Sequence, residues 1–559
     1  MNESDAAYLL QDDVRASVDA DVGASAWVTA YRKVQDQAEN GGVFCALVPD
    51  ADILDSLASG TWDMSVGSGC PGCSQSFDGA TRTTAYHRYG RAGGIEPLVF
   101  VRDHNGLHPR SIEILEEYRH FHNLYFDATR AEYLRVDDGG REEVVVKVLP
   151  DRVDMLLRPL RQFLALKRMH LALLYDMVRF SEQSVDVIPH QKRSTVVSLS
   201  DRRYSIDIRE CDWMRDRKFR SFSRLLGKRL IPPLPVEQSG IWPYNEDEQR
   251  QYCEFIIARD SEGKELRYTS DPARLANYFG KNPRAPHYLT PVFFQREVLK
   301  KYYDQTAKYR VVDGALFCGD LWMLRIDNNH ETHVVAFLGD LGETLSYEEQ
   351  LHWLHHNVAP EGGVSEVEWK RSFLAEPSEP TSADLIFVRA LVRFQDDWVT
   401  QHGWPLFLPL LSGDEHYFRG LHVPVTKDAT EFEQQVLALT KLLVDSINVA
   451  EISRLLPAGP KDEKSLAKLD RYHEANQYPA RAADLKLLRD LQDLRSSGVA
   501  HRKGHRYDEV AERFGIPDRE PGAVFEGILK RLTDMLGALS AHYMPAHTGA
   551  PAPGEGSIE

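Results

Sequence analysis

The hydrophobic pattern of this chain changes its period at about residue 425, and this change constrains the fold more than any other feature. Before that point, short apolar runs alternate with turn residues, which is typical of β-strands. After it, apolar residues recur every three or four positions, which predicts amphipathic helices. With 559 residues, the chain is long enough for several domains of these two kinds.

We therefore expect a multidomain α+β protein. Its parts, in order, are an acidic N-terminal segment at 1–24, a mixed α/β domain at 25–194, a β-rich α+β domain at 195–424, an all-α four-helix bundle at 425–546 and a disordered tail at 547–559. The tail is assigned to disorder because it is rich in Pro and Gly and has no apolar periodicity.

In the mixed α/β domain, apolar runs at 43–48 and 97–102 predict strands, and helical spacing at 110–121 predicts a helix. The turn sequence at 137–140 (DDGG) lies between two further apolar runs and predicts a hairpin. The segment 156–180 is apolar at helical spacing, so we expect one long helix there.

In the β-rich domain, two β-branched runs lie within 194–208, and 309–338 alternates apolar runs with the turns Asp313-Gly314 and Asn328-Asn329. This alternation is typical of a β-meander. Helices are predicted beside it at 296–303, 347–355 and 383–399.

The four helices of the predicted bundle are separated by short links. They lie at 431–456, 463–474, 482–497 and 524–539. Thr430 followed by Glu433 fits a capping box at the start of the first helix.

The net charge is −17, which argues against broad binding to nucleic acid or to an anionic membrane. The acidity is uneven, because 425–546 contains 18 Lys and Arg against 19 Asp and Glu. A local basic site in this part therefore remains compatible with the composition. No signal sequence or membrane-spanning segment is indicated, and the six cysteines form no disulfide framework, so we expect a cytoplasmic protein with no membrane partner.

The pattern that points most directly to chemistry is Arg495, five intervening residues and His501, at the end of an amphipathic helix. Histidine can both accept and donate a proton near neutral pH, and could act on a ribose 2′-OH or on the 5′-oxygen that leaves. Arginine offers permanently charged donors to a phosphoryl group whose charge grows in the transition state.

This arrangement resembles the HEPN superfamily, in which Arg is followed by four to six residues and then His within a helical bundle. The resemblance covers about 120 residues, and it implies metal-independent RNA cleavage without a cofactor, often by a homodimer that combines two Arg/His sets. Arg502, Lys503 and Arg506 add positive charge after His501 and are expected to contact RNA. Ser496 departs from the family, where Asn, Asp or His commonly follows the Arg. The rest of the chain resembles only uncharacterised bacterial proteins, which implies no chemistry.

The resemblance implies an effector of the toxin or phage-defence type, in which the N-terminal regions sense a trigger or restrain the nuclease. The alternative is a non-catalytic scaffold protein that dimerises through its bundle. In that case Arg495 pairs with Asp490 or Asp493, and His501 stabilises the helix C-terminus.

A second basic segment, 215–229, carries seven basic residues with Phe219 and Phe222 between them. This composition suits phosphate contact with aromatic stacking, and also suits a solvated helix face. If the segment binds RNA, the contacting residues are Arg217, Lys218 and Arg220.

Metal binding is the least favoured function. Cys70 and Cys73 supply only half of a zinc site. The Glu-x-x-His pairs Glu117/His120 and Glu349/His352 occur in regions that are not predicted to be bundles, so we expect no metal ligands.

Overall fold

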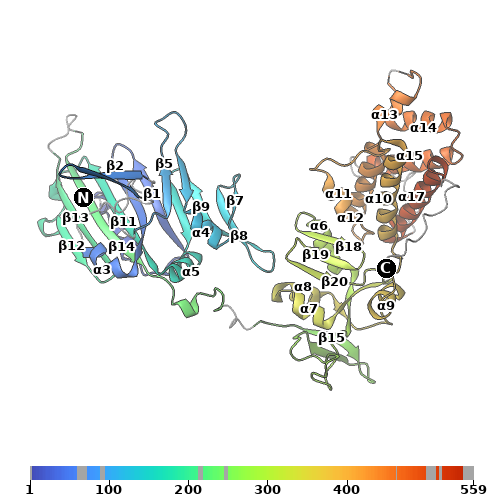
Figure 1. Cartoon of the computed structure of the whole chain (residues 1–559), viewed down its shortest axis with the longest axis horizontal. Helices are drawn as coiled ribbons and strands as arrows, with labels where there is room; N and C mark the ends of the chain where they lie inside the picture. The colour runs from blue at the N-terminus through green and yellow to red at the C-terminus, as the bar shows by residue number, and fades with distance from the viewer. Residues whose placement is uncertain are drawn as a thin grey trace. The chain divides into compact units, whose positions relative to one another are not determined.

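The computed structural model describes residues 3–58, 72–87, 95–211, 218–244, 250–460, 462–498, 512–514, 516 and 519–545. The chain is mixed α+β, with a large antiparallel sheet and a set of C-terminal helices (Figure 1). It divides into two compact units, the first made of Met1–Asp137 and Arg141–Gln249, the second of Asp138–Gly140 and Arg250–Glu559.

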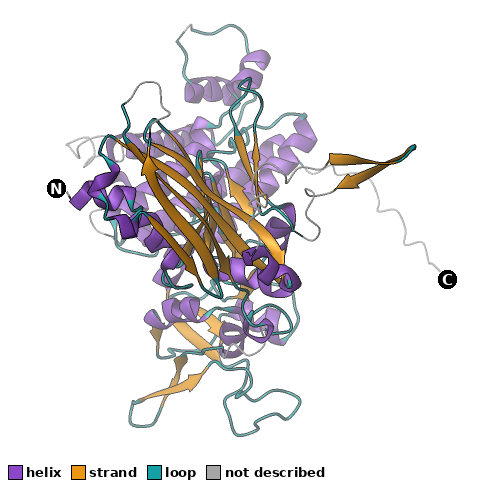
Figure 2. Ribbon diagram, turned by 90° about the vertical axis from the view of Figure 1, so that its left-hand side faces the viewer, coloured by secondary structure: helices purple, strands orange, loops and turns teal. Residues whose placement is uncertain are grey.

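Ten antiparallel strands form one sheet in the first unit, and Figure 2 shows them as a broad orange layer. The order is β12-β13-β14-β11-β2-β1-β10-β9-β8-β7. Their bounds in this order are Ser194–Ser198, Arg202–Glu210, Ser221–Ile231, Met169–Ser181, Glu39–Pro49, Trp27–Gln35, Arg152–Leu156, Glu142–Leu149, Glu132–Val136 and Tyr125–Asp127. The predicted boundary between residues 194 and 195 falls at the start of β12, so the sheet continues across it.

The strands predicted at 43–48 and 97–102 are confirmed as β2 and β5 (Val99–Arg102). The hairpin predicted around 137–140 is confirmed by the pairing of β8 with β9. The helix predicted at 110–121 forms only in its second half, as α4 (Glu116–Phe121), because the first half is strand β6 (Ser111–Ile114).

The long helix predicted at 156–180 is wrong in its second half. Helix α5 (Leu157–Lys167) ends at Arg168, whose φ of 56° is left-handed, and the chain continues as β11. Strand β11 is covered on both faces, because Leu171 and Leu173 belong to one buried cluster and Ala172 to another. A strand buried on both faces has no polar alternation, so its apolar run has no clear strand period.

The N-terminal segment packs against this sheet. Helix α2 (Asp12–Asp19), which follows α1 (Glu3–Leu9), places Val14 and Val18 in the core of the first unit. Arg179 of β11 donates to both carboxylate oxygens of Asp13 at 2.6 and 2.7 Å. The acidic residue therefore pairs with a buried arginine on a central strand.

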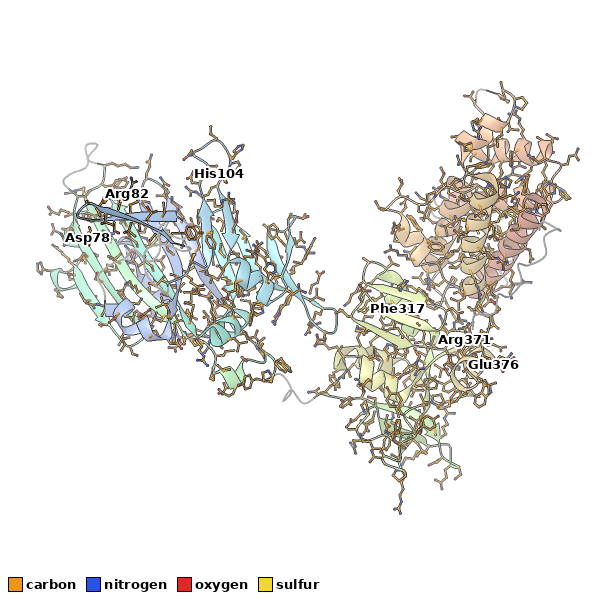
Figure 3. All side chains as sticks on the ribbon, in the orientation of Figure 1. Asp78, Arg82, His104, Phe317, Arg371 and Glu376 are labelled. Carbon is orange, nitrogen blue, oxygen red and sulfur yellow. The ribbon has the colours of Figure 1, made fainter. Side chains whose placement is uncertain are left out.

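In the second unit, the predicted meander is confirmed for β18 (Tyr309–Val312), β19 (Ala315–Cys318) and β20 (Trp322–Arg325). Arg371, labelled in Figure 3, donates to both carboxylate oxygens of Asp313 in the first meander turn at 2.8 and 2.7 Å. The last predicted run becomes β21 (His333–Phe337), which pairs with the distant β17 (Pro291–Gln295).

Further elements complete the β-rich part of this unit. They are the hairpin of β15 (Glu254–Arg259) and β16 (Glu265–Thr269), the strand β22 (Asn357–Val358) and the helices α6 (Lys300–Asp304), α7 (Leu338–Thr344), α8 (Tyr347–His355) and α9 (Glu366–Phe373). The helix predicted at 347–355 is confirmed, and Ser346 caps it by accepting from Glu349 N.

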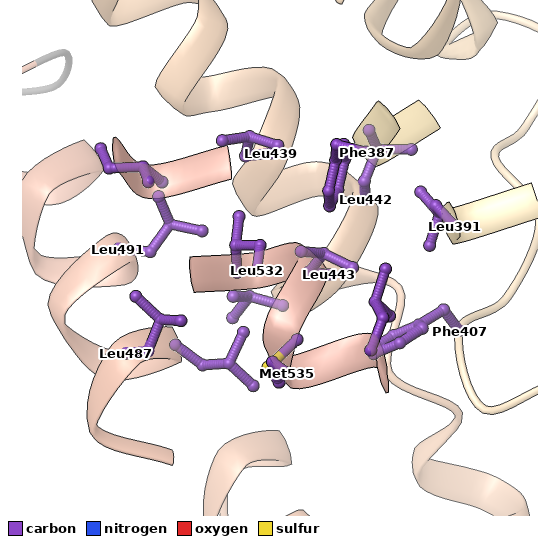
Figure 4. Packing of buried hydrophobic residues seen from close by; sticks show 14 of the residues in the cluster. Phe387, Leu391, Phe407, Leu439, Leu442, Leu443, Leu487, Leu491, Leu532 and Met535 are labelled. Carbon is purple, nitrogen blue, oxygen red and sulfur yellow. The ribbon is translucent and has the colours of Figure 1, made fainter. Parts of the chain in front are cut away.

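The C-terminal helices share one apolar core (Figure 4). They are α10 (Ala383–His402), α12 (Ala429–Thr440), α13 (Val449–Leu455), α14 (Ser465–Ala475), α15 (Arg481–Gly498) and α17 (Pro521–Tyr543). Helix α10 forms where predicted, but it contributes Phe387 and Leu391 to this core and packs against α17. The helical core therefore begins before residue 425.

The first predicted bundle helix differs in detail. Its N-cap is Asp428, which accepts from Thr430 N at 2.9 Å, so the capping box at Thr430 is wrong by two residues. The predicted single helix is also interrupted, because a π-helical turn (Lys441–Asp445) separates α12 from α13. Among the described residues, no helix is both long and apolar enough to cross a membrane.

Candidate functional site

Helix α15 is positioned by its apolar stripe. Leu485, Leu488, Leu491 and Leu494 are all buried in the helical core. Arg495 follows this stripe by one residue and therefore lies at its edge, in the last turn of the helix. About 32% of its side chain is exposed, so Arg495 is partly accessible to solvent.

Asp445 holds the Arg495 guanidinium. Nη1 of Arg495 donates to the two carboxylate oxygens of Asp445 at 2.9 and 3.1 Å. Asp445 is itself 36% exposed. The carboxylate of Asp445 therefore compensates the charge of Arg495, and both side chains remain partly exposed. An anion at this helix end would have to compete with this carboxylate for the guanidinium.

The π-helical turn places Asp445 opposite Arg495. Leu442, Leu443 and Val444 of this turn are buried, and Asp445 ends it. A π-turn inserts an extra residue into a helix and changes the direction of the side chains that follow, and such turns are frequent at functional sites. Asp445 was not predicted as a site residue, because it is 50 residues from Arg495 and nothing in its own segment indicates so distant a partner.

The other half of the predicted catalytic pair is outside the described residues. His501 and the basic residues Arg502, Lys503 and Arg506 all lie between 498 and 512, beyond the described end of α15. Ser496 is described, and its hydroxyl donates to the Gln492 carbonyl at 2.7 Å.

In the alternative interpretation, Arg495 pairs with Asp490 or Asp493, and the structure shows that Asp490 has other partners. Asp490 is 5% exposed and pairs with Lys486 at 2.6 Å and with Arg513 at 3.0 Å. Arg495 pairs instead with Asp445, a residue of another helical segment. Its ion pair therefore connects two elements of the helical core.

The described part of the second basic segment, residues 218–229, is not a helix. Its second half is β14, in which Lys228 and Arg229 are 1% and 6% exposed, and Arg224 pairs with Asp176 at 2.9 Å. Phe219 is also buried, at 7% exposure, so its ring face is not open for stacking on a base. The interpretation as a solvated helix face is therefore wrong.

The three residues predicted to contact RNA in this segment lie before β14. Arg217 is outside the described residues. Nζ of Lys218 lies 3.9 Å from Oε1 of Glu182. Arg220 donates its backbone N–H to the carbonyl oxygen of Ser181 at 2.8 Å. Their role in RNA binding stays a prediction.

The histidines of the two Glu-x-x-His pairs, and His122 next to the first pair, have other partners. The ring of His122 lies 2.9 Å from Pro159 O, and burial lowers the pKa of His122 to about 4. The His352 ring lies 2.9 Å from Val298 O, and His120 lies beside Glu116. Within the described ranges, no three His, Cys, Asp or Glu side chains are grouped so that they could hold a metal ion.

The glutamates of the two Glu-x-x-His pairs also have partners within the protein. Glu117 pairs with Lys167 at 2.7 Å. Burial favours the neutral form of Glu349, but hydrogen bonds from Lys301 and Tyr302 outweigh it, so the pKa of Glu349 is lowered. Of the Cys pair, Cys70 lies outside the described residues and Cys73 is exposed.

A buried hydrogen bond between His422 and Glu431, which the sequence did not indicate, anchors the start of α12. Glu431 accepts from His422 Nε2 at 2.8 Å and from the backbone N–H groups of Val425 and Thr426. His422 also stacks on Tyr303, with ring centroids 3.8 Å apart. These contacts fix the segment that leads into α12.

No protein-family model, curated protein or solved structure matches this chain.

Proposed function

We propose that this protein cleaves RNA without a metal ion, using Arg495 and His501 in a HEPN-like helical domain. The observation that carries the proposal is the Arg495–Asp445 pair, which holds a partly exposed guanidinium at the end of α15, six residues before His501. The shared core of α10, α12, α14, α15 and α17 supports it by providing the helical setting that the motif requires.

In this reaction, His501 removes the proton of a ribose 2′-OH, and the 2′-oxygen attacks the adjacent phosphorus. Arg495 stabilises the added negative charge on the phosphoryl oxygens. The bond from phosphorus to the 5′-oxygen breaks, and that oxygen takes a proton from a histidine. The products are a 2′,3′-cyclic phosphate and a 5′-hydroxyl. A homodimer supplies a second Arg495/His501 set, so that one histidine can act as base and the other as acid.

The test is incubation of the purified chain with single-stranded RNA in EDTA. We expect cleavage by the wild type and a loss of at least about a hundredfold in His501→Ala and in Arg495→Ala, as is typical of removing a general base or a charge-stabilising group. Arg489→Ala is the matched control, because Arg489 is on the same helix and pairs with Asp470 at 2.9 Å. Full activity in both site variants would rule out the assignment.

The second candidate is a non-catalytic protein that dimerises through the helical domain. The ion pair favours this candidate in one respect, because Arg495 already has a carboxylate partner on another segment. In that case Arg495→Ala should lower the melting temperature or dissociate the dimer, and no RNA cleavage should be found in the wild type. Sedimentation of the wild type and the variant, measured beside the cleavage assay, distinguishes the two candidates.

A further inference from the structure

The loop 277–286 of the second unit exposes two aromatic rings to solvent. It follows β16, the partner of the strand labelled β15 in Figure 1. Phe279 is 97% exposed and Tyr278 is 78% exposed. Burying a phenylalanine side chain is favourable by about 1.5–3 kcal/mol relative to leaving it in water. A loop that exposes such a ring is therefore suited to contact a partner.

Hydrogen bonds hold this loop in one shape. The side-chain oxygen of Asn277 accepts from the backbone N–H groups of Phe279 at 3.0 Å and Lys281 at 3.1 Å. Asn282, at a φ of 44°, donates its side-chain amide to the carbonyl oxygen of Leu275 at 3.2 Å. The rings are therefore presented by an ordered turn, and a partner that binds them has little ordering cost.

The two rings are not equivalent. The ring of Tyr278 contacts the ring of His287, with the two ring centroids 4.5 Å apart and the ring planes inclined by 62°. His287 is fixed in turn, because its Nδ1 accepts from the backbone N–H of Leu289 at 3.1 Å. Tyr278 thus has a supported ring, and Phe279 projects freely beside it.

Three cationic residues lie within the loop or close to it in the sequence. Arg274, Lys281 and Arg284 are all exposed, and within the part of the chain that the structure describes none of them forms an ion pair. The only acidic residue in 271–290 is Asp271, which accepts from Ala273 N at 2.8 Å. In a chain with a net charge of −17, the segment 271–290 therefore carries three cationic residues against one acidic residue.

We propose that the loop 277–286 is a contact site for single-stranded nucleic acid. The rings of Tyr278 and Phe279 stack on bases, and Lys281 and Arg284 contact the flanking phosphates. A single strand fits this composition better than an anionic membrane, because unpaired bases offer flat faces on which the two rings can stack. The proposal does not depend on RNA cleavage, because stacking and phosphate contact need no catalytic group.

The test is fluorescence anisotropy of the full-length chain with a labelled oligo(dT) single strand. DNA lacks the 2′-OH that the proposed cleavage uses, so binding is measured whether or not the chain cleaves RNA. We expect binding by the wild type and an affinity about tenfold lower for each of Tyr278→Ala and Phe279→Ala. Lys281→Ala with Arg284→Ala should lower the slope of log affinity against log salt by about 1.4, or about 0.7 for each phosphate contact.

Matched controls come from exposed residues elsewhere. Phe77→Ala removes a ring that is 71% exposed on the hairpin of β3 (Gly72–Asp78) and β4 (Thr81–His87), and Arg393→Ala removes an exposed cation of α10. Both should leave affinity unchanged, and circular dichroism should show that all variants are folded. The proposal is overturned if the wild type does not bind the strand at low salt, or if binding is equal in the loop variants. It is also overturned if these variants lose only binding to phosphatidylserine vesicles.

Discussion

The guanidinium of Arg495 donates to both carboxylate oxygens of Asp445, although 50 residues of sequence separate them. Both side chains are about one-third exposed, and an ion pair in such a place adds at most about 1 kcal/mol to stability. The consequence of this pair is therefore mainly geometric, because it fixes the direction of the arginine in the last turn of α15.

Replacing Asp445 by Asn should separate the effect of this carboxylate on the orientation of Arg495 from its effect on the stability of the fold. The free energy of unfolding should change by less than about 1 kcal/mol, since the pair is partly exposed. Arg495 loses a competitor for phosphate, so KM for RNA should fall several-fold, and kcat should fall about tenfold because the guanidinium is less well oriented. Steady-state cleavage kinetics measure both, with Asp470→Asn, a partner of Arg489, as the control. A large loss of stability with unchanged kcat would give Asp445 a purely structural role.

Acid should destabilise the helical core through Glu431. Burial alone raises its pKa, but hydrogen bonds from His422 and Thr426 outweigh burial and lower the pKa of Glu431 from 4.5 to about 2. A carboxyl whose pKa is lowered on folding stabilises fully above pH 4.5, and this stability is lost as the pH falls towards 2. The shift corresponds to about 3 kcal/mol.

Urea unfolding of wild type and Glu431→Gln at pH 7 and pH 3 measures this contribution. The variant should be less stable by about 3 kcal/mol at pH 7, and the difference should shrink at pH 3. Glu526→Gln, which removes a half-exposed carboxylate of α17, should behave as the wild type. An equal difference between wild type and Glu431→Gln at both pH values would contradict the account.

Phe387→Ala should show that α10 belongs to the helical core. Phe387 is 0% exposed, and the cavity left by its ring should cost about 3–5 kcal/mol. Hydrogen exchange should then lose protection in α10 and α17 while protection in β11 is unchanged. Ile386→Ala, at the neighbouring position that is 37% exposed, is the control and should have a small effect. Equal exchange in α10 and α17 of wild type and Phe387→Ala would place α10 outside this core.

Elements with one buried face could be predicted closely. Helix α8 begins and ends where its pattern predicts, because Ser346 caps it and Trp353 marks its buried side. The strands around the turn at 137–140 are also confirmed. In both cases the residues that determine the element lie within it or next to it, so the local sequence is sufficient to predict it.

Elements that depend on distant partners could not be predicted. The apolar run of β11 has helical spacing, but pairing with β2 and β14 on its two sides makes it a strand. The π-turn ending at Asp445 interrupts a continuous helical pattern, and nothing in the local sequence shows that Arg495 lies opposite it. The motif therefore singles out Arg495 as a candidate, whereas its pairing with Asp445 could not be predicted.

The most direct measurement of the central claim is the chemistry of the ends left on RNA by the wild type in EDTA. Mass spectrometry should find a 2′,3′-cyclic phosphate on one product and a 5′-hydroxyl on the other, and RNA treated with His501→Ala should stay intact. Cleavage that leaves a 3′-hydroxyl and a 5′-phosphate, or that stops when EDTA is added, would contradict the account.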